Sequence, residues 1–279
     1  MVAYDKPEID FSQFPESDGE PMAETSANVV QMVDLIYALR TLLIAQQRMP
    51  ATVSGNQFVY YNPLSGRDNI SPDVYVVFDS TVMGPAKWQT WVEGKFPDIV
   101  FEITSPSTEQ QDLSDEPGGK RRLYARLGAR EYYIYDPQLE MVPPFQGFSL
   151  RDGRMEPLPI LPSGGISSPL LETELRPMTM AATQRHMGGA WLRVIDPWSG
   201  QPIAVSDEEH DALEVTQEQL TETREELTET REELTEAREE LTAEARTRIA
   251  AEARAARAEA ALQALLAEQA RRQDSTGGE

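Results

Sequence analysis

The stretch that most constrains the fold is residues 97–137, in which two apolar runs flank a short basic segment. The first run, residues 99–103, is almost unbroken, which is typical of a strand buried on both faces of a layered α/β sheet. A helix is predicted over residues 120–127, with Gly128 ending it, and the aromatic run 132–135 predicts a second strand. The stretch therefore predicts a strand, a crossover helix and another strand.

Glu102 stands inside the first of these strands. A carboxylate among apolar residues is costly unless a cation or hydrogen-bond donors meet it, and hydroxyl side chains beginning with Thr104 follow at the polar end of the strand. The strand is therefore expected to present the carboxylate of Glu102 to a site. The alternative is a buried structural pair between Glu102 and Lys120 or an arginine.

The rest of the body gives further elements of an α/β fold. Helical spacing of apolar residues predicts a helix over residues 24–48, and strands are predicted at 57–61 and 73–78. Residues 83–96 are expected to form a covering loop outside the sheet. The dipeptide 152–153, Asp-Gly, predicts the turn of a β-hairpin.

Asp73 enters its apolar strand much as Glu102 does. Asp73 and Asp98 both follow a proline, and either could simply cap the start of a strand. We keep Asp73 as a candidate site residue, with capping as its alternative, and interpret Asp98 as a cap.

The C-terminal part is different in kind, because residues 210–274 contain repeats of TETREEL and neither glycine nor proline. A long helix is predicted, with leucine in a heptad at positions 220, 227, 234 and 241. With leucine at position a, arginine occupies e and glutamate occupies g, which favours a parallel homodimer; a solvated single helix is the alternative. The helix is expected to bury no area against the sheet domain.

Composition limits the kinds of site. With no cysteine and two histidines, a metal must be held by oxygen ligands. We find no signal peptide and no apolar run of membrane length, so we expect a soluble, cytoplasmic protein without a membrane partner. The net charge of −22 means that contact with nucleic acid must depend on a local basic patch. We divide the chain into an N-terminal arm that is expected to be mobile and disordered (1–23), a globular domain (24–205) and a helical tail (206–279).

At this point the chain resembles a known family. The matching segments are PDVYVVF at 72–78, PDIVFEITSPST at 97–108, Asp112, Lys120, Tyr124 and GAREYYIYDP at 128–137. They are similar, in the same order, to the Uma-type family of bacterial restriction endonucleases in the PD-(D/E)XK nuclease superfamily, over about residues 25–200. The resemblance implies a restriction-endonuclease-like α/β fold, a mixed central sheet flanked by helices, and Mg²⁺-dependent (or Mn²⁺-dependent) cleavage of DNA.

The resemblance also implies roles for particular residues. Asp73 corresponds to the aspartate of the motif and Glu102 to its D/E residue, so both are expected to bind the metal ion. The superfamily lysine should stand two residues after the acid, but Thr104 is there. Lys120 on the following helix is expected to replace it as the third catalytic residue, with Asp112 and Thr104 lying just outside the metal ligands.

Two hypotheses of different class follow. In the first, the protein is a metal-dependent endonuclease, and Arg121, Arg122 and Arg126 contact phosphates of the nucleic acid. In the second, the fold is kept without efficient catalysis, and the protein is a DNA-associated or assembly adaptor that acts through its helical tail. Lys120 could instead be a solvated charge, and Tyr124, like the neighbouring tyrosines, is expected to pack in the core.

Overall fold

A six-stranded mixed sheet forms the centre of the molecule in the computed structural model, which describes residues 14–16, 26–105, 108–182 and 188–276. Its strands, in spatial order, are β1 (Ala51–Ser54), β4 (Val74–Phe78), β6 (Ile99–Ile103), β7 (Glu131–Tyr135), β8 (Phe145–Arg151) and β9 (Arg154–Pro157). Two smaller sheets are β10 (Ile166–Ser168), β11 (Thr173–Met180) and β12 (Gly189–Val194), and β3 (Asn69–Ile70), β2 (Val59–Tyr60) and β5 (Trp88–Gln89). The predicted mixed sheet is confirmed.

The predicted strand, helix and strand unit lies at the middle of the large sheet. β6 and β7 are parallel neighbours, with Ile99 opposite Glu131, and the helix α4 (Lys120–Leu127) lies between them in the chain. Gly128 adopts the left-handed conformation, φ 89°, and its N–H reaches the carbonyls of Tyr124 and Ala125. Glycine adopts this conformation without steric cost, so Gly128 ends the helix as predicted.

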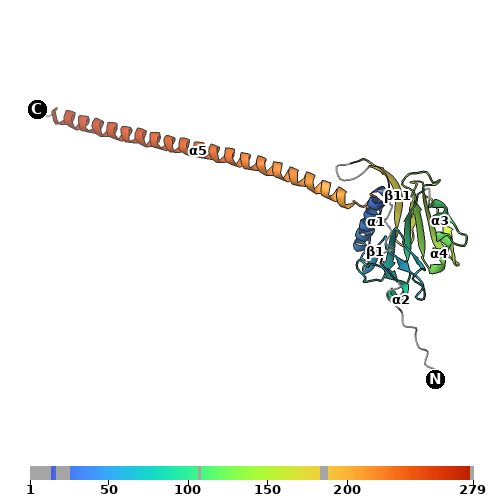
Figure 1. Ribbon diagram of the computed structural model, residues 1–279. Coiled ribbons are helices and arrows are strands. Elements are labelled where there is room, and N and C mark those ends of the chain that lie inside the picture. The colour runs from blue at the N-terminus through green and yellow to red at the C-terminus, as the bar shows by residue number, and fades with distance from the viewer. Residues whose placement is uncertain (1–13, 17–25, 106–107, 183–187, 277–279) are drawn as a thin grey trace, which may run out of the picture. The chain divides into compact units, whose positions relative to one another are not determined.

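One face of the large sheet packs against α1 (Ser26–Ala45) and the sheet β10–β12 (Figure 1). Leu39, Val76 and Phe101 belong to this core cluster and are buried. A pair of hydrogen bonds fastens α1 to β12: Gln31 Nε2 donates to the carbonyl of Leu192 (3.2 Å), and Leu192 N–H donates to Gln31 Oε1 (2.7 Å). The first helix of the body is therefore tied to its last strand.

The opposite face packs against α4 and the short strands β2 and β5. Residues alternate between the faces of a strand, so Tyr75 and Val77 of β4, Val100 of β6 and Tyr132 of β7 all lie on this side, and all are buried. In Figure 1, α3 (Glu109–Leu113) and α4 lie across the sheet from α1. By the same alternation, Glu102 lies on the α4 side.

The tail forms the helix α5 (Ser206–Thr276), and the chain divides into two compact units, Met1–His210 and Asp211–Glu279. The first turn of α5 belongs to the first unit. There the guanidinium of Arg193, which is 4% exposed, pairs with Glu208 at 2.7 Å, and Tyr37 donates to Glu209. The expectation that the helix buries nothing against the body is therefore wrong for this first turn.

The prediction of a covering loop over residues 83–96 is wrong in part. Trp88 and Gln89 form β5, which pairs in parallel with β2, and the short helix α2 (Thr90–Glu93) follows. Trp88 is fully buried, and its indole N–H donates to the carbonyl of Lys95 at 2.8 Å. A strand of two residues is too short to show alternation in the sequence, and for the same reason β3 was not predicted. The four residues of β1 are all buried, so they show no alternation either, and this strand was not predicted.

Most of the predicted N-terminal arm lies outside the described residues, but Phe14 does not. Its side chain is 1% exposed and packs against the rings of Tyr60 and Trp91. The carbonyl of Phe14 accepts a hydrogen bond from Lys87, and that of Pro15 accepts one from Tyr60. The prediction of a mobile arm is therefore wrong at this point.

The statement that no apolar run reaches membrane length is also wrong. α1 is long and apolar enough, by length and composition, to cross a membrane. The same composition suits a helix packed on a sheet, and Leu39, Leu42 and Leu43 are fully buried in the core. In this fold, therefore, α1 acts as a core helix.

Candidate active site

The candidate site begins with Glu102 on β6. β4 and β6 are antiparallel with Val74 opposite Phe101, which places Asp73, the residue before β4, next to Glu102 at the end of the ladder. Opposite residues of an antiparallel pair lie on the same face, and here it is the face covered by α4. Two acids predicted from separate apolar runs are therefore neighbours.

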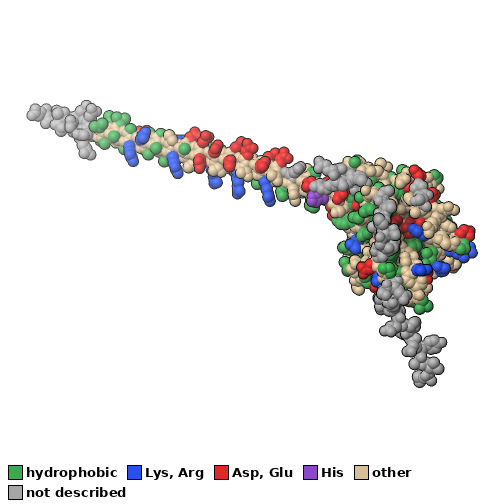
Figure 2. All heavy atoms as spheres, viewed as in Figure 1, with side chains coloured by type: hydrophobic (Ala, Val, Ile, Leu, Met, Phe, Trp, Pro, Cys, Tyr) green, Lys and Arg blue, Asp and Glu red, His purple; other side chains and the backbone are tan. Residues whose placement is uncertain are grey.

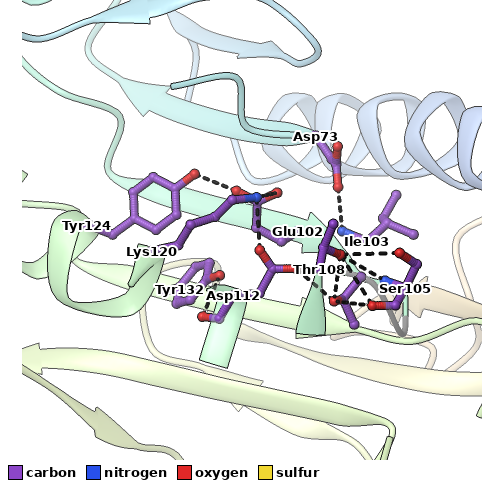
Figure 3. Close-up of polar contacts among 10 residues, drawn as sticks. Asp73, Glu102, Ile103, Ser105, Thr108, Asp112, Lys120, Tyr124 and Tyr132 are labelled. Carbon is purple, nitrogen blue, oxygen red and sulfur yellow. Dashed lines mark hydrogen bonds and ion pairs between the residues drawn. The ribbon is translucent and has the colours of Figure 1, made fainter. Parts of the chain in front are cut away.

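Asp73 has a contact of its own at this edge. Its Oδ2 accepts a hydrogen bond of 2.6 Å from the backbone N–H of Ile103, the last residue of β6 (Figure 3). This contact joins Asp73 to the end of the neighbouring strand β6, which differs from the cap at the start of a strand that was considered for Asp73 in the sequence. It engages one carboxylate oxygen and fixes the side chain beside the end of β6.

Lys120 lies between two carboxylates. It is the first residue of α4, and its Nζ is 3.0 Å from Glu102 Oε2 and 2.9 Å from Asp112 Oδ1. Its side chain is 19% exposed, so the alternative of a solvated charge is wrong. The resemblance places a lysine on the same strand as the acid. Here the amino group of Lys120 reaches Glu102 from helix α4 instead.

Thr104 and Asp112 support this arrangement from the other side. Asp112 belongs to α3, is 1% exposed, and its Oδ2 accepts a hydrogen bond of 2.7 Å from Thr104 Oγ1. Thr104 therefore occupies the position expected for lysine and binds the carboxylate that holds Lys120. The sequence put Asp112 in the right neighbourhood, but the helix α3 was not predicted.

Tyr124 is a residue of the candidate site whose contact with Glu102 was not predicted from the sequence. It is fully buried, as predicted, but its hydroxyl donates a hydrogen bond of 2.5 Å to Glu102 Oε1 (Figure 3). Tyr124 follows Lys120 by one helical turn, so both side chains point to the same side of α4. The spacing in the sequence could have indicated this contact, because a helix that directs Lys120 toward Glu102 also directs Tyr124, four positions later, to the same side.

The charges of the site are strongly coupled. Burial, reinforced by the carboxylates of Asp73 and Asp112, raises the pKa of Glu102 to about 8, while Lys120 and Tyr124 act in the opposite direction. Burial disfavours the charged form of Lys120, but Glu102 and Asp112 outweigh it and raise its pKa. Burial also raises the pKa of Tyr124 well above its usual value, so its hydroxyl keeps its proton and remains a donor.

These residues suit a hard divalent cation. In the described part of the chain, no group of three or more His, Cys, Asp or Glu side chains is placed to hold a metal ion. Mg²⁺, however, commonly binds to one or two carboxylates and keeps several waters. Asp73 and Glu102 supply such a pair, and the buried Oδ1 of Asp112 has the ion pair with Lys120 but no hydrogen bond of normal geometry. Lys120 pairs with the carboxyl groups of Glu102 and Asp112, and Asp73 lies beside Glu102, so added positive charge would be stabilising.

The three arginines of α4 differ in their surroundings. Arg121 lies over the ring of Phe148, with its guanidinium carbon 5.1 Å from the ring centroid, and near Asp115 at 3.8 Å. Arg122 and Arg126 are exposed and line a cavity on another side of the helix. The three side chains therefore do not form one phosphate-binding cluster.

Comparison with known proteins identifies the family of the chain. A family model described as "Uma2: Putative restriction endonuclease" matches residues 12–181, which include every residue of the site. No curated protein matches the chain. The match covers more than half of the chain and confirms the resemblance found in the sequence. The chain therefore belongs to this restriction endonuclease family and has its restriction-endonuclease-like fold.

Proposed function

We propose that the protein is a divalent-metal-dependent endonuclease that hydrolyses phosphodiester bonds of DNA. The observation that supports this most is the position of Lys120 between Glu102 and Asp112, with Asp73 beside them at the end of the strand pair. Two carboxylates and one amine at a strand end are the side chains that this hydrolysis needs. The family supports a nuclease; the metal requirement and the DNA substrate are our proposals.

In the proposed reaction Asp73 and Glu102 hold Mg²⁺ or Mn²⁺, which when bound supplies Lewis acidity toward the phosphate and activates a water molecule. The ammonium of Lys120 stabilises the negative charge that develops on the phosphate, or orients the attacking water. Tyr124 donates to Oε1 of Glu102 and thereby fixes the orientation of that carboxylate. Thr104 and Asp112 hold Lys120 in place.

Nicking of supercoiled plasmid tests the proposal. We expect nicking in Mg²⁺, none in EDTA, and loss of activity in Asp73→Asn and Glu102→Gln. Glu140→Gln, at an exposed carboxylate of the same domain, is the matched control and should keep full activity. Robust cleavage in EDTA, or full activity of the Glu102→Gln variant, would contradict the mechanism.

The adaptor hypothesis is the second candidate, and the displaced lysine together with the acidic composition favours it. An inactive site of this kind should bind neither Mg²⁺ nor Mn²⁺ in a manner that depends on Asp73 and Glu102. Isothermal titration calorimetry with each metal, on the wild type and on the two variants, separates the candidates. Metal binding that both substitutions abolish favours the enzyme.

We also propose that the tail forms a parallel homodimer. On α5 the leucines at 220, 227, 234 and 241 are at least half exposed. Arg224, Arg231 and Arg238 make no ion pair among the described residues, and Figure 2 shows acidic side chains along one side of the helix and basic ones along the other. In a parallel pair, Glu226 would face Arg231 of the second copy, so the leucine stripe and the charges favour the same partner. Such a dimer would bring two nuclease domains to one end of the coiled coil, an arrangement that would suit cleavage of both strands.

A further inference from the structure

A cavity of about 610 Å³ lies beside α4, outside the candidate active site. Its lining comes from three parts of the chain: Tyr61 after β2, the start and outer side of α4 with Gly119, Arg122 and Arg126, and Gly153 at the turn between β8 and β9. In Figure 2, basic side chains are visible on the body where Figure 1 places α4. The cavity is therefore a basic site on an acidic protein.

The two arginines of this cavity lack acidic partners. In the described part of the chain no ion pair or hydrogen bond involves the side chain of Arg122 or Arg126, whereas Arg121 is held by Phe148 and Asp115. The residues three and four positions from either arginine include no carboxylate that could pair with it along the helix. Two neighbouring arginines repel each other, and a protein with a charge of −22 has many acids that could have relieved this.

Tyr61 faces the same cationic groups. Burial and the carboxylate of Asp68 raise the pKa of Tyr61, and the charge of Arg126 acts against them, which places this guanidinium near the phenol. The Oδ2 of Asp68 already accepts a hydrogen bond of 2.6 Å from Asn62. The polar groups that converge on the cavity are thus two guanidinium groups and one hydroxyl, all donors.

The helix α4 links this cavity to the active site. Successive residues of a helix are turned by about 100°, so Arg122 and Arg126 point away from Lys120 and Tyr124 by roughly 200°. One side of α4 therefore holds Glu102, and the other side holds the two free cations. A ligand in the cavity would be positioned by the same rigid element that positions Lys120.

We propose that this cavity binds a phosphate of the nucleic-acid backbone, on a nucleotide away from the bond that is cut. Guanidinium groups match the oxygens of phosphate in geometry and charge, and at Gly119 and Gly153 the cavity wall has no side chain. A phosphodiester at this point would set the register of the strand across α4 without reading its sequence. The identity of the ligand as nucleic acid rests on the function proposed above.

Binding of duplex DNA at several salt concentrations tests the site. We compare Arg122→Gln/Arg126→Gln with Arg254→Gln/Arg257→Gln, two exposed arginines of the tail, both in the full-length chain with Glu102→Gln to prevent cleavage. Each lost phosphate contact lowers the slope of log K against log salt by about 0.9, so the cavity variant, which loses one phosphate, should have a slope smaller by about 0.9 for every DNA sequence. The tail variant should keep the slope. An equal slope in both variants would overturn the proposal.

A second titration separates this proposal from the nuclease function. Inorganic pyrophosphate is added to the wild type and to the cavity variant, and binding is followed by calorimetry. If the wild type nicks DNA and neither the salt slope nor pyrophosphate binding depends on the arginines, the nuclease function is supported and the phosphate site is refuted. If pyrophosphate binding depends on the arginines but the protein does not bind DNA, the nucleic-acid ligand is refuted. Melting curves of both arginine variants are compared with that of the Glu102→Gln parent, from which they differ at exposed side chains only, to check that the fold is intact.

Discussion

Replacing Glu102 by glutamine should change how the stability of the body depends on pH. The pKa of Glu102 is raised to about 8 in the folded protein, chiefly by burial, whereas an unfolded glutamate titrates near its ordinary value. Between these two values the folded state holds a proton that the unfolded state has lost. The free energy of unfolding must therefore fall as pH rises through this window and level off above the folded pKa.

The magnitude follows from the number of protons. One proton is worth about 1.4 kcal/mol per pH unit, so from about pH 5.5 to about pH 7.5 the wild type should lose about 3 kcal/mol relative to Glu102→Gln. Glutamine keeps an oxygen for the hydroxyl of Tyr124 and carries no charge, so it does not take part in this loss. The raised pKa of Lys120 concerns alkaline pH and contributes nothing within the window.

Urea unfolding in EDTA, followed by tryptophan fluorescence at each pH, measures the difference. All four tryptophans lie before α5, so the signal reports on the body. The control is Glu140→Gln, whose carboxylate is exposed and whose curve should run parallel to the wild type. The reasoning is refuted if the curves of wild type and Glu102→Gln are parallel, because Glu102 would then be ionised throughout and its two donors would outweigh its burial.

Three further predictions concern other parts of the molecule. Lys120→Met leaves the buried carboxylate of Asp112 without its cation, so we expect a loss of roughly 3 kcal/mol in urea unfolding at neutral pH and no plasmid nicking; an unchanged stability would show that the ion pair is dispensable. Tyr124→Phe removes a donor to the ionised form of Glu102, so the pH profile of nicking should move to higher pH and stability should fall by about 1–3 kcal/mol; an unmoved profile would assign the hydroxyl a purely structural role. A double substitution of the leucines at 227 and 234 by alanine should convert the full-length dimer to monomer in sedimentation equilibrium, and a wild type that is already monomeric at tens of micromolar would refute the paired tail.

The main acids and the lysine could be predicted because their signals are local. Glu102 interrupts an apolar run, and Asp73 begins another, so both had to lie at strands, and strand alternation then sets their common face. Lys120 opens a helix directly after two glycines, where its side chain was free to turn inward. For these residues the local sequence pattern, an acid in an apolar strand or a lysine at the start of a helix, also determines where the side chain lies in the fold.

The remaining features depend on contacts that no short pattern encodes. The bond from Tyr124 to Glu102 requires the distance between α4 and β6, and the stacking of Arg121 on Phe148 requires the packing of α4 against β8. β5 has two residues and exists because β2 lies beside it. Phe14 likewise is buried only because a distant aromatic pair accepts it.

The two hydrogen bonds between Gln31 and Leu192 have a consequence for the order of folding. They join residues 161 positions apart, whereas Tyr124 and Glu102 are separated by 22. Closing a longer loop costs more chain entropy, so the segment that contains Glu102 should gain structure before α1 and β12 meet. Gln31→Ala is therefore expected to accelerate unfolding and leave the refolding rate unchanged in stopped-flow experiments, giving a φ-value near zero. The catalytic segment would then be formed in a chain whose two ends are still apart.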